Sequence, residues 1–244
     1  RRVMTEVSDF SETMAGKPPA SVADMCATAA WQAAFGVTEF ALYYNRQQRR
    51  PAEYNAYGTF VGRLNALLRD ARPAPRVLLY YPITDVWAEY KPITDYIPTN
   101  SSNIRVPRIA DSFMALGQRM TRGQISFALA DHAVLAGAGI ENGELCIGQQ
   151  RFTMVVLPAE VELPMETSAV LERFEACGGR VLRETADRKI DPMSLAAAYN
   201  NGKLNEPADR LVMGRFIRAG HEMIVVVNVG TVSCDRTLAA ENPL

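Results

Sequence analysis

The sequence lacks the features that mark membrane, metal-cluster and nucleic-acid-binding proteins. No apolar run approaches the roughly 18 residues of a membrane span, and Met223–Val229 is too short. No Cys-x-x-Cys pair is present, which argues against a zinc cluster or a disulfide scaffold. The four cysteines are Cys26, Cys146, Cys177 and Cys234. The formal net charge of −1 lacks the basic excess of nucleic-acid-binding domains. We therefore expect neither a membrane nor a nucleic acid as a partner.

What is present is an ordinary globular composition. The 244 residues are 48% hydrophobic and 22% charged, enough for one large domain or two modest ones. The sequence begins without an initiator Met or a signal peptide, and it ends soon after what resemble the opening strands of another unit. These features predict a piece of a longer polypeptide, so the missing targeting segment says nothing about the compartment.

Residues 1–71 are predicted to alternate between strands and helices. The predicted elements are a strand at 2–5, a helix at 22–35, a strand at 37–44 and a helix near 57–69. Glu6 follows the first strand, Ser21 is a predicted N-cap, and Gly36 ends the first helix. This order is typical of parallel β/α architecture. A whole (β/α)8 barrel needs about 250 residues, so residues 1–71 would be its last two units.

Residues 76–190 are predicted to form a second α/β domain, after a linker at 72–75. The predicted elements are strands at 76–81, 127–129, 153–157 and 180–183, helices at 111–121 and 164–177, a hairpin around 140–150, and an irregular stretch at 82–108. This pattern predicts an open-sheet domain of flavodoxin-like type, with helices covering a parallel sheet. Two later strands predict a hairpin that begins an all-β domain at 205–244.

The ligand-binding motifs of such open-sheet domains are absent. A flavodoxin has a Ser/Thr/Gly phosphate loop after its first strand, whereas this chain has Pro82-Ile83-Thr84-Asp85 without glycine. A glutamine amidotransferase has Gly-x-Cys-x-Gly, but Cys146 lacks the first glycine and lies in the predicted hairpin. No dinucleotide fingerprint or P-loop is present. FMN binding and glutaminase chemistry are therefore not expected, and we predict no cofactor.

Several segments together resemble the later part of a large bacterial glycoside hydrolase. They are the strand ending in Glu6, the junction Trp31–Val37, the strands Phe40–Tyr44 and Arg76–Pro82, and the pair Phe152–Pro158 with Phe174–Val181. The resemblance is to glycoside hydrolase family 106 α-L-rhamnosidases and, more distantly, family 42 β-galactosidases. It implies a (β/α)8 barrel, then a flavodoxin-like domain of glutamine-amidotransferase shape, then a β-sandwich. It also implies a carbohydrate substrate and a periplasmic or extracellular bacterial location.

Glu6 is the candidate catalytic residue. Glycoside hydrolysis generally uses two carboxyl groups, and barrel enzymes place catalytic residues at the carboxyl ends of strands. The resemblance puts a catalytic Glu at this strand end, and an ordinary surface Glu is the alternative. The partner acid would lie on another strand, so the stereochemical outcome is not predicted. Asp9 and Glu12, in the next loop, could bind sugar hydroxyls or calcium, or could simply be solvated.

Tyr44, Asn45 and Trp87 join Asp9 as candidate substrate-binding residues. Alternate strand positions face opposite ways, so at most one of Tyr43 and Tyr44 faces the barrel axis, and core packing is the alternative for either. Trp87 could stack on a sugar ring, or it could pack between domains. Asp131-His132 follows a predicted strand, but no Ser or Cys nucleophile motif accompanies it.

The alternative function is a non-catalytic structural or oligomerisation module of a multidomain carbohydrate-active protein. A homo-oligomer is compatible with either function. As an isolated piece the chain is expected to be inactive, because it would hold only two of the eight barrel units.

Overall fold

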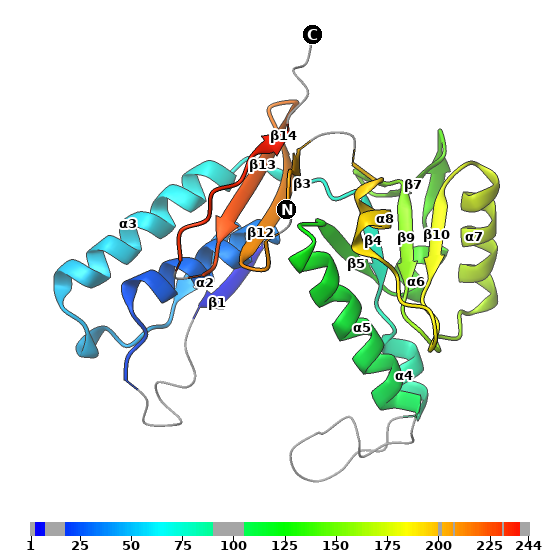
Figure 1. Cartoon of the computed structure of the whole chain (residues 1–244), viewed down its shortest axis with the longest axis horizontal. Coiled ribbons are helices and arrows are strands. Elements are labelled where there is room, and N and C mark those ends of the chain that lie inside the picture. The colour runs from blue at the N-terminus through cyan, green and yellow to red at the C-terminus, as the bar shows by residue number, and fades with distance from the viewer. Residues whose placement is uncertain are drawn as a thin grey trace. The chain divides into compact units, whose positions relative to one another are not determined.

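The computed structural model describes residues 3–7, 18–89, 105–199, 202–206, 208–230 and 232–239, and it is a mixed α/β structure (Figure 1). The chain divides into two compact units. The first combines residues 1–74 with 204–237, and the second combines 75–203 with 238–244. The sheets of the described ranges do not close into a barrel. In the same ranges, no helix has the length and hydropathy to cross a lipid bilayer.

The first unit contains two successive strand–helix pairs. They are β1 (Met4–Val7), α2 (Val22–Ala34), β2 (Glu39–Leu42) and α3 (Pro51–Leu68), with the short 3₁₀ helix η1 (Arg46–Gln48) before α3. β1 and β2 pair in parallel. Val7 from β1 packs with Met25 and Ala29 of α2 and with Tyr57 and Val61 of α3. One face of the strand pair is therefore covered by both helices.

Local capping explains where these helices begin. The Ser21 hydroxyl accepts a hydrogen bond from the Asp24 N–H at 3.2 Å, which confirms the predicted N-cap of α2. α3 begins six residues earlier than predicted. Pro51 occupies its first turn, and the Glu53 carboxylate accepts the Arg50 N–H at 3.0 Å. The polar residues that suggested a loop are thus the capped first turns of a helix.

A three-stranded antiparallel sheet completes the first unit. It consists of β3 (Arg72–Pro73), β12 (Leu211–Arg218) and β13 (His221–Asn228), in the order β13-β12-β3. The hairpin of β12 and β13 confirms the sequence prediction. The predicted linker at 72–75 is wrong for its first half, because β3 pairs with β12.

This sheet packs on α2, and Phe216 of β12 also packs with Phe40 of β2. Ala30 and Ala34 of α2 contact Val212 and Val227. A Cβ at Gly214 would lie 2.2 Å from the carbonyl oxygen of Ala34, so only glycine permits this approach of β12 to α2.

The division into domains at 1–71, 76–190 and 205–244 stays a prediction.

The second unit is built on a four-stranded parallel sheet (Figure 1). Its strands are β4 (Val77–Tyr80), β5 (Phe127–Ala130), β9 (Met154–Leu157) and β10 (Arg180–Arg183), and its helices are α4 (Ile83–Glu89), α5 (Arg105–Arg122), α6 (His132–Ala136), α7 (Met165–Ala176) and α8 (Pro192–Ala196). The spatial order is β10-β9-β4-β5. Counted along the chain, the parallel strands therefore lie in the order 2-1-3-4. Part of the stretch predicted as irregular is the helix α4.

Helices cover both faces of this sheet, because every residue of its central strands is apolar and successive side chains point to opposite faces. Leu78 of β4 faces a core that includes α6 and α7. Its neighbours Val77 and Leu79 face a second core, formed with α5 and α8. The small antiparallel sheet of β6 (Gly139–Glu141), β7 (Glu144–Ile147) and β8 (Gln150–Phe152) adds to the first of these cores. A two-stranded pair joins β11 (Lys203–Leu204) to β14 (Leu238–Ala239).

Candidate functional site

The β1–β2 strand pair has one covered face and one exposed face. Thr5 and Val7 are in register with Phe40 and Leu42, and this set faces α2 and α3. Side chains alternate along a strand, so Glu6 and its register partner Ala41 point to the opposite face. Glu6 is exposed there. The face away from the helices is the one that lines the interior when such units close into a barrel.

Glu6 lies near the carboxyl end of β1. The sequence predicted it just after the strand, but β1 extends through Val7, so Glu6 is its penultimate residue. The strand is longer at this end because Thr5–Val7 continue in register with β2. Glu39 shares the face of Glu6 but begins β2, opposite Met4. Two acids therefore occupy one face at opposite ends of the strand pair.

The two tyrosines after β2 point to opposite faces. Tyr43 is 66% exposed, and its N–H donates to the Val7 carbonyl at 3.0 Å, so the extended pairing continues this far. Tyr44 is 5% exposed. Its ring lies edge-on to Tyr57 at 5.5 Å and beneath the Arg49 guanidinium at 5.2 Å. A substrate-binding role for Tyr44 stays a prediction, and its buried position favours the core-packing alternative.

Asn45 has a local role in the backbone. Its side-chain oxygen accepts the Gln47 N–H at 3.0 Å and caps η1. Its carbonyl accepts a hydrogen bond from the Arg49 guanidinium at 2.9 Å. Substrate binding by Asn45 stays a prediction. Asp9 and Glu12 lie outside the described residues.

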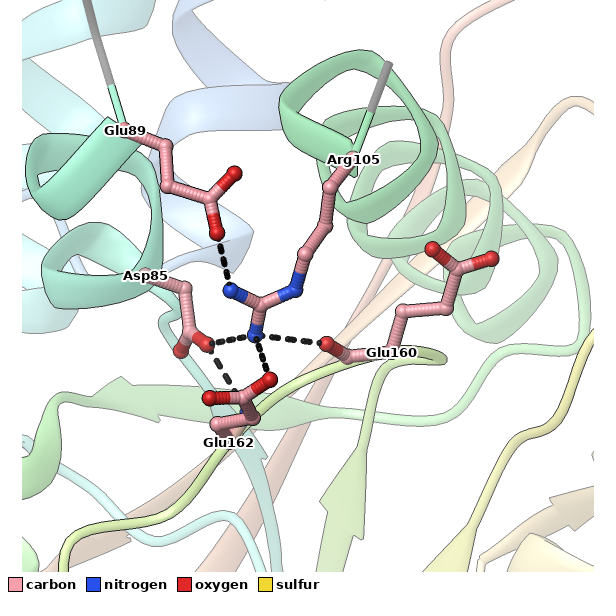
Figure 2. A network of polar contacts seen from close by, with 5 residues as sticks. All are labelled: Asp85, Glu89, Arg105, Glu160 and Glu162. Atoms are coloured by element: carbon pink, nitrogen blue, oxygen red, sulfur yellow. Dashed lines mark hydrogen bonds and ion pairs between the residues drawn. The ribbon is translucent and has the colours of Figure 1, made fainter. Parts of the chain in front are cut away.

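In the second unit, the carboxyl ends of β4 and β9 meet at an ion-pair network. Figure 2 shows the Arg105 guanidinium between the carboxylates of Asp85, Glu89 and Glu162. It donates to Asp85 at 2.9 Å, to the Glu160 carbonyl at 3.0 Å, and to Glu89, and it lies 3.3 Å from the Glu162 carboxylate. The Glu162 N–H also donates to Asp85 at 2.8 Å. The network ties α4, α5 and the segment after β9 together.

Burial dominates the electrostatics of this network. The Asp85 side chain is only 3% exposed, and burial raises the pKa of its carboxyl against the opposing effects of the Glu162 N–H and Arg105. Burial, with Asp85 and Asp131 nearby, also raises the pKa of Tyr80 to about 12. Glu160 has a positive φ of 61°, a conformation that few non-glycine residues adopt. In that conformation the Glu160 carbonyl accepts a hydrogen bond from Arg105, as part of the network.

Trp87 lies on a different face of α4 from the network. It is 70% exposed, and it is three residues after Thr84, so these two side chains share one side of the helix. The Thr84 hydroxyl lies 2.7 Å from Nδ1 of His132, at the start of α6. The sequence pointed to Asp131-His132 but not to its hydroxyl partner, which is 48 residues away. Substrate binding by Trp87 stays a prediction.

Metal-ligating side chains are not clustered in the parts of the chain that the structure describes. Across those ranges, no group of three or more His, Cys, Asp and Glu side chains is placed to hold a metal ion. Cys146 lies on β7 within the small antiparallel sheet, as its sequence context predicted. It is therefore not at the strand-to-helix turn that a glutaminase nucleophile requires.

Comparison with known proteins gives one structural similarity. No family model matches the chain, and no curated protein matches it. The α-L-fucosidase isoenzyme 2 from Paenibacillus thiaminolyticus is similar in structure with a TM-score of 0.45 and 17% sequence identity. The match covers 92% of this chain and 32% of that chain, so the chain spans about a third of the fucosidase's length. The similar structure is a glycoside hydrolase, but the similarity does not show that this chain belongs to family 106 or family 42.

Proposed function

We propose that this chain is part of a glycoside hydrolase that cleaves an O-glycosyl bond with a pair of carboxylates, one of which is Glu6. The observation that carries the proposal is the position of Glu6. It lies near the carboxyl end of a parallel strand, exposed, on the face that α2 and α3 leave uncovered. This is where barrel enzymes hold catalytic side chains.

The proposed architecture extends the observed elements. β1, α2, β2 and α3 would be two consecutive units of a (β/α)8 barrel, and the second unit would be flavodoxin-like. The 2-1-3-4 order of its parallel strands supports this, because flavodoxin-like sheets have the order 2-1-3-4-5. The hairpin of β12 and β13 would begin a β-sandwich. Within this proposal, family 106 is the family that the sequence resembles.

In this mechanism Glu6 acts at the anomeric centre, as the acid that protonates the leaving oxygen or as the nucleophile or base. The second carboxylate is not assigned to a residue of this chain. Tyr43 is exposed beyond β2, on the face that carries Glu6, and its ring is available to stack on a sugar. Trp87 offers a second exposed ring in its own unit. The substrate would be a carbohydrate.

A supporting role for the second unit is favoured by a specific observation. Open α/β sheets bind ligands at the carboxyl ends of their strands. Here the ends of β4 and β9 are bridged by Arg105, which is held by carboxylates of the chain itself (Figure 2). We infer that this edge braces the unit, and that catalysis belongs to the first unit.

The test uses the natural polypeptide in which this chain occurs, with a panel of aryl glycosides. Glu6→Gln removes the titrating group while keeping the side chain's shape, so we expect kcat to fall about 100- to 10,000-fold with an unchanged melting temperature. Glu39→Gln is the matched control, since Glu39 shares the sheet face but lies at the other end. We expect it to retain near-normal turnover.

Near-normal turnover by Glu6→Gln would overturn the assignment. If the unsubstituted protein cleaves no glycoside and binds no monosaccharide, the non-catalytic structural or oligomerisation module replaces the hydrolase as the function.

A further inference from the structure

β10 forms one edge of the parallel sheet in the second unit. It pairs with β9 on one side, and no strand pairs with its other side among the residues that the structure describes. The N–H groups of Arg180 and Glu184 donate to β9, at 3.2 and 3.0 Å. Because donors alternate along a parallel ladder, the N–H groups of Val181 and Arg183 point toward the outer edge. Backbone donors and side chains are thus presented together on this edge.

A cavity of about 630 Å³ lies along this edge. It is lined by the four residues of β10, by residues 188–191 and by Ser194. Its volume is within the range of about 300–1,000 Å³ that small-molecule sites occupy. Val181, Leu182 and Ile190 give it an apolar part. The cavity is therefore large enough for a compact ligand with a carbon framework.

Cationic residues outnumber acidic residues in the lining of the cavity. Four cationic residues line it (Arg180, Arg183, Arg188 and Lys189), and Asp191 is the one acidic residue among those lining it. The whole chain has 26 Lys and Arg against 27 Asp and Glu, so this excess is local.

Two of the four cations already have acidic partners. Lys189 lies 3.0 Å from the buried Glu184 carboxylate, and Arg183 lies 3.6 Å from Glu175. Within the described part of the chain, the side chains of Arg180 and Arg188 have no ion pair. The cavity thus presents two guanidinium groups that no acid among the described residues neutralises.

We propose that this cavity binds a small organic anion, with its carboxylate or phosphate held by Arg180 and Arg188. A guanidinium donates two parallel hydrogen bonds to an oxyanion, a geometry that lysine does not provide. The carbon framework of the ligand packs against Val181 and Ile190, and the outward N–H groups of β10 lie beside it. Pairing of two β10 edges from separate copies is disfavoured, because it would bring like-charged arginines together.

The experiment is isothermal titration of the purified full-length protein with glucuronate, glucose 6-phosphate, inorganic phosphate and neutral glucose. Glucuronate and glucose 6-phosphate distinguish a carboxylate from a phosphate as the bound group. We expect at least one of them to bind and glucose not to bind. We also expect inorganic phosphate to bind more weakly, because it has no carbon framework. Added salt should weaken binding.

Arg180→Gln and Arg188→Gln should each weaken binding about tenfold or more, the effect of losing a charge-assisted hydrogen-bonding pair. Arg173→Gln is the matched control, because Arg173 lines a separate cavity beside Cys177. It should bind as the unsubstituted protein does. The proposal is overturned if neither organic anion binds, or if both Arg180→Gln and Arg188→Gln bind with unchanged affinity. Its failure would leave the glycosidase proposal unaffected, since that is tested at Glu6.

Discussion

Both units place acidic side chains near the carboxyl ends of parallel strands, but in opposite surroundings. Glu6, near the end of β1, is exposed on the face opposite to the one that α2 and α3 cover. Asp85, just after β4, is buried and bonded to Arg105. The same βα arrangement thus leaves one acid available to a ligand and commits the other to holding the fold. Position at a strand end therefore does not identify a catalytic acid unless the acid is also accessible.

The largest difference between the two units should appear in kcat when Glu6 and Asp85 are each replaced by the corresponding amide. In the natural polypeptide, Glu6→Gln should lower kcat by about 100-fold or more while the melting temperature stays unchanged, because only the proton-transferring group is lost. Asp85→Asn should leave kcat unchanged. Steady-state kinetics and thermal unfolding of both variants check this. If Asp85→Asn lost as much turnover as Glu6→Gln, the assignment of Glu6 to catalysis and of Asp85 to the fold would be contradicted.

Removal of the guanidinium should strongly destabilise the second unit. Arg105→Ala leaves the buried Asp85 carboxylate without its cation, which should lower the free energy of unfolding by about 3 kcal/mol. Arg108→Ala is the control. Its ion pair with Glu160 spans 3.6 Å and its side chain is 58% exposed, so the loss should stay within about 1 kcal/mol. Urea unfolding measures both, and equal losses would contradict the role given to Arg105.

A smaller effect is expected at the exposed tyrosine of the first unit. Tyr43→Ala should raise KM a few-fold with little change in kcat, because stacking of an aromatic ring contributes about 1 kcal/mol. Tyr44→Phe is the comparison. Tyr44 is buried against Tyr57, and its ring packing is kept in phenylalanine, so KM should stay the same. A larger change in KM for Tyr44→Phe than for Tyr43→Ala would restore Tyr44 as the substrate-binding residue.

The smallest effect concerns pH. Burial raises the pKa of Asp85, so the folded protein holds the proton of this carboxyl more tightly than the unfolded chain does. In the unfolded chain the pKa of an Asp carboxyl is about 3.9. The Asp85 contribution to stability is therefore present at low pH and is lost as pH rises through its raised folded pKa. Asp85→Asn lacks this contribution, so its free energy of unfolding should fall less between about pH 4 and pH 7. Parallel curves for the two proteins would contradict the raised pKa.

The longer strands and helices of both units follow from local sequence. Ser21 marks the start of α2, and the apolar run before Pro158 becomes β9 at the centre of its sheet. Errors occurred where polar residues cap a helix, as in the first turns of α3, and where a short stretch finds a distant partner. β3 is such a stretch, because it pairs with β12 more than 130 residues later. Composition alone marks it as a linker.

The candidate site was only partly predictable from the sequence, because some of its features depend on contacts between distant parts of the chain. The sequence predicts the position of Glu6 near a strand end. That Tyr43 and not Tyr44 is exposed depends on where α3 packs, because alternation assigns two faces but does not say which one is covered. The Arg105 network joins residues 16 to 77 positions apart, and nothing local in the sequence pairs them.

The sequence by itself determined the longer strands, the bounds of α2 and α7 to within about one residue, and the cap at Ser21, since these depend on backbone sterics and on hydrogen bonds between near neighbours. The tertiary structure alone decided which acid is exposed and which is neutralised, and it brought Arg180 of β10 and Arg188, which have no ion pair among the described residues, to one cavity. Burial and charge at a given atom are set by side chains that arrive from distant parts of the chain, and their arrival depends on how whole elements pack.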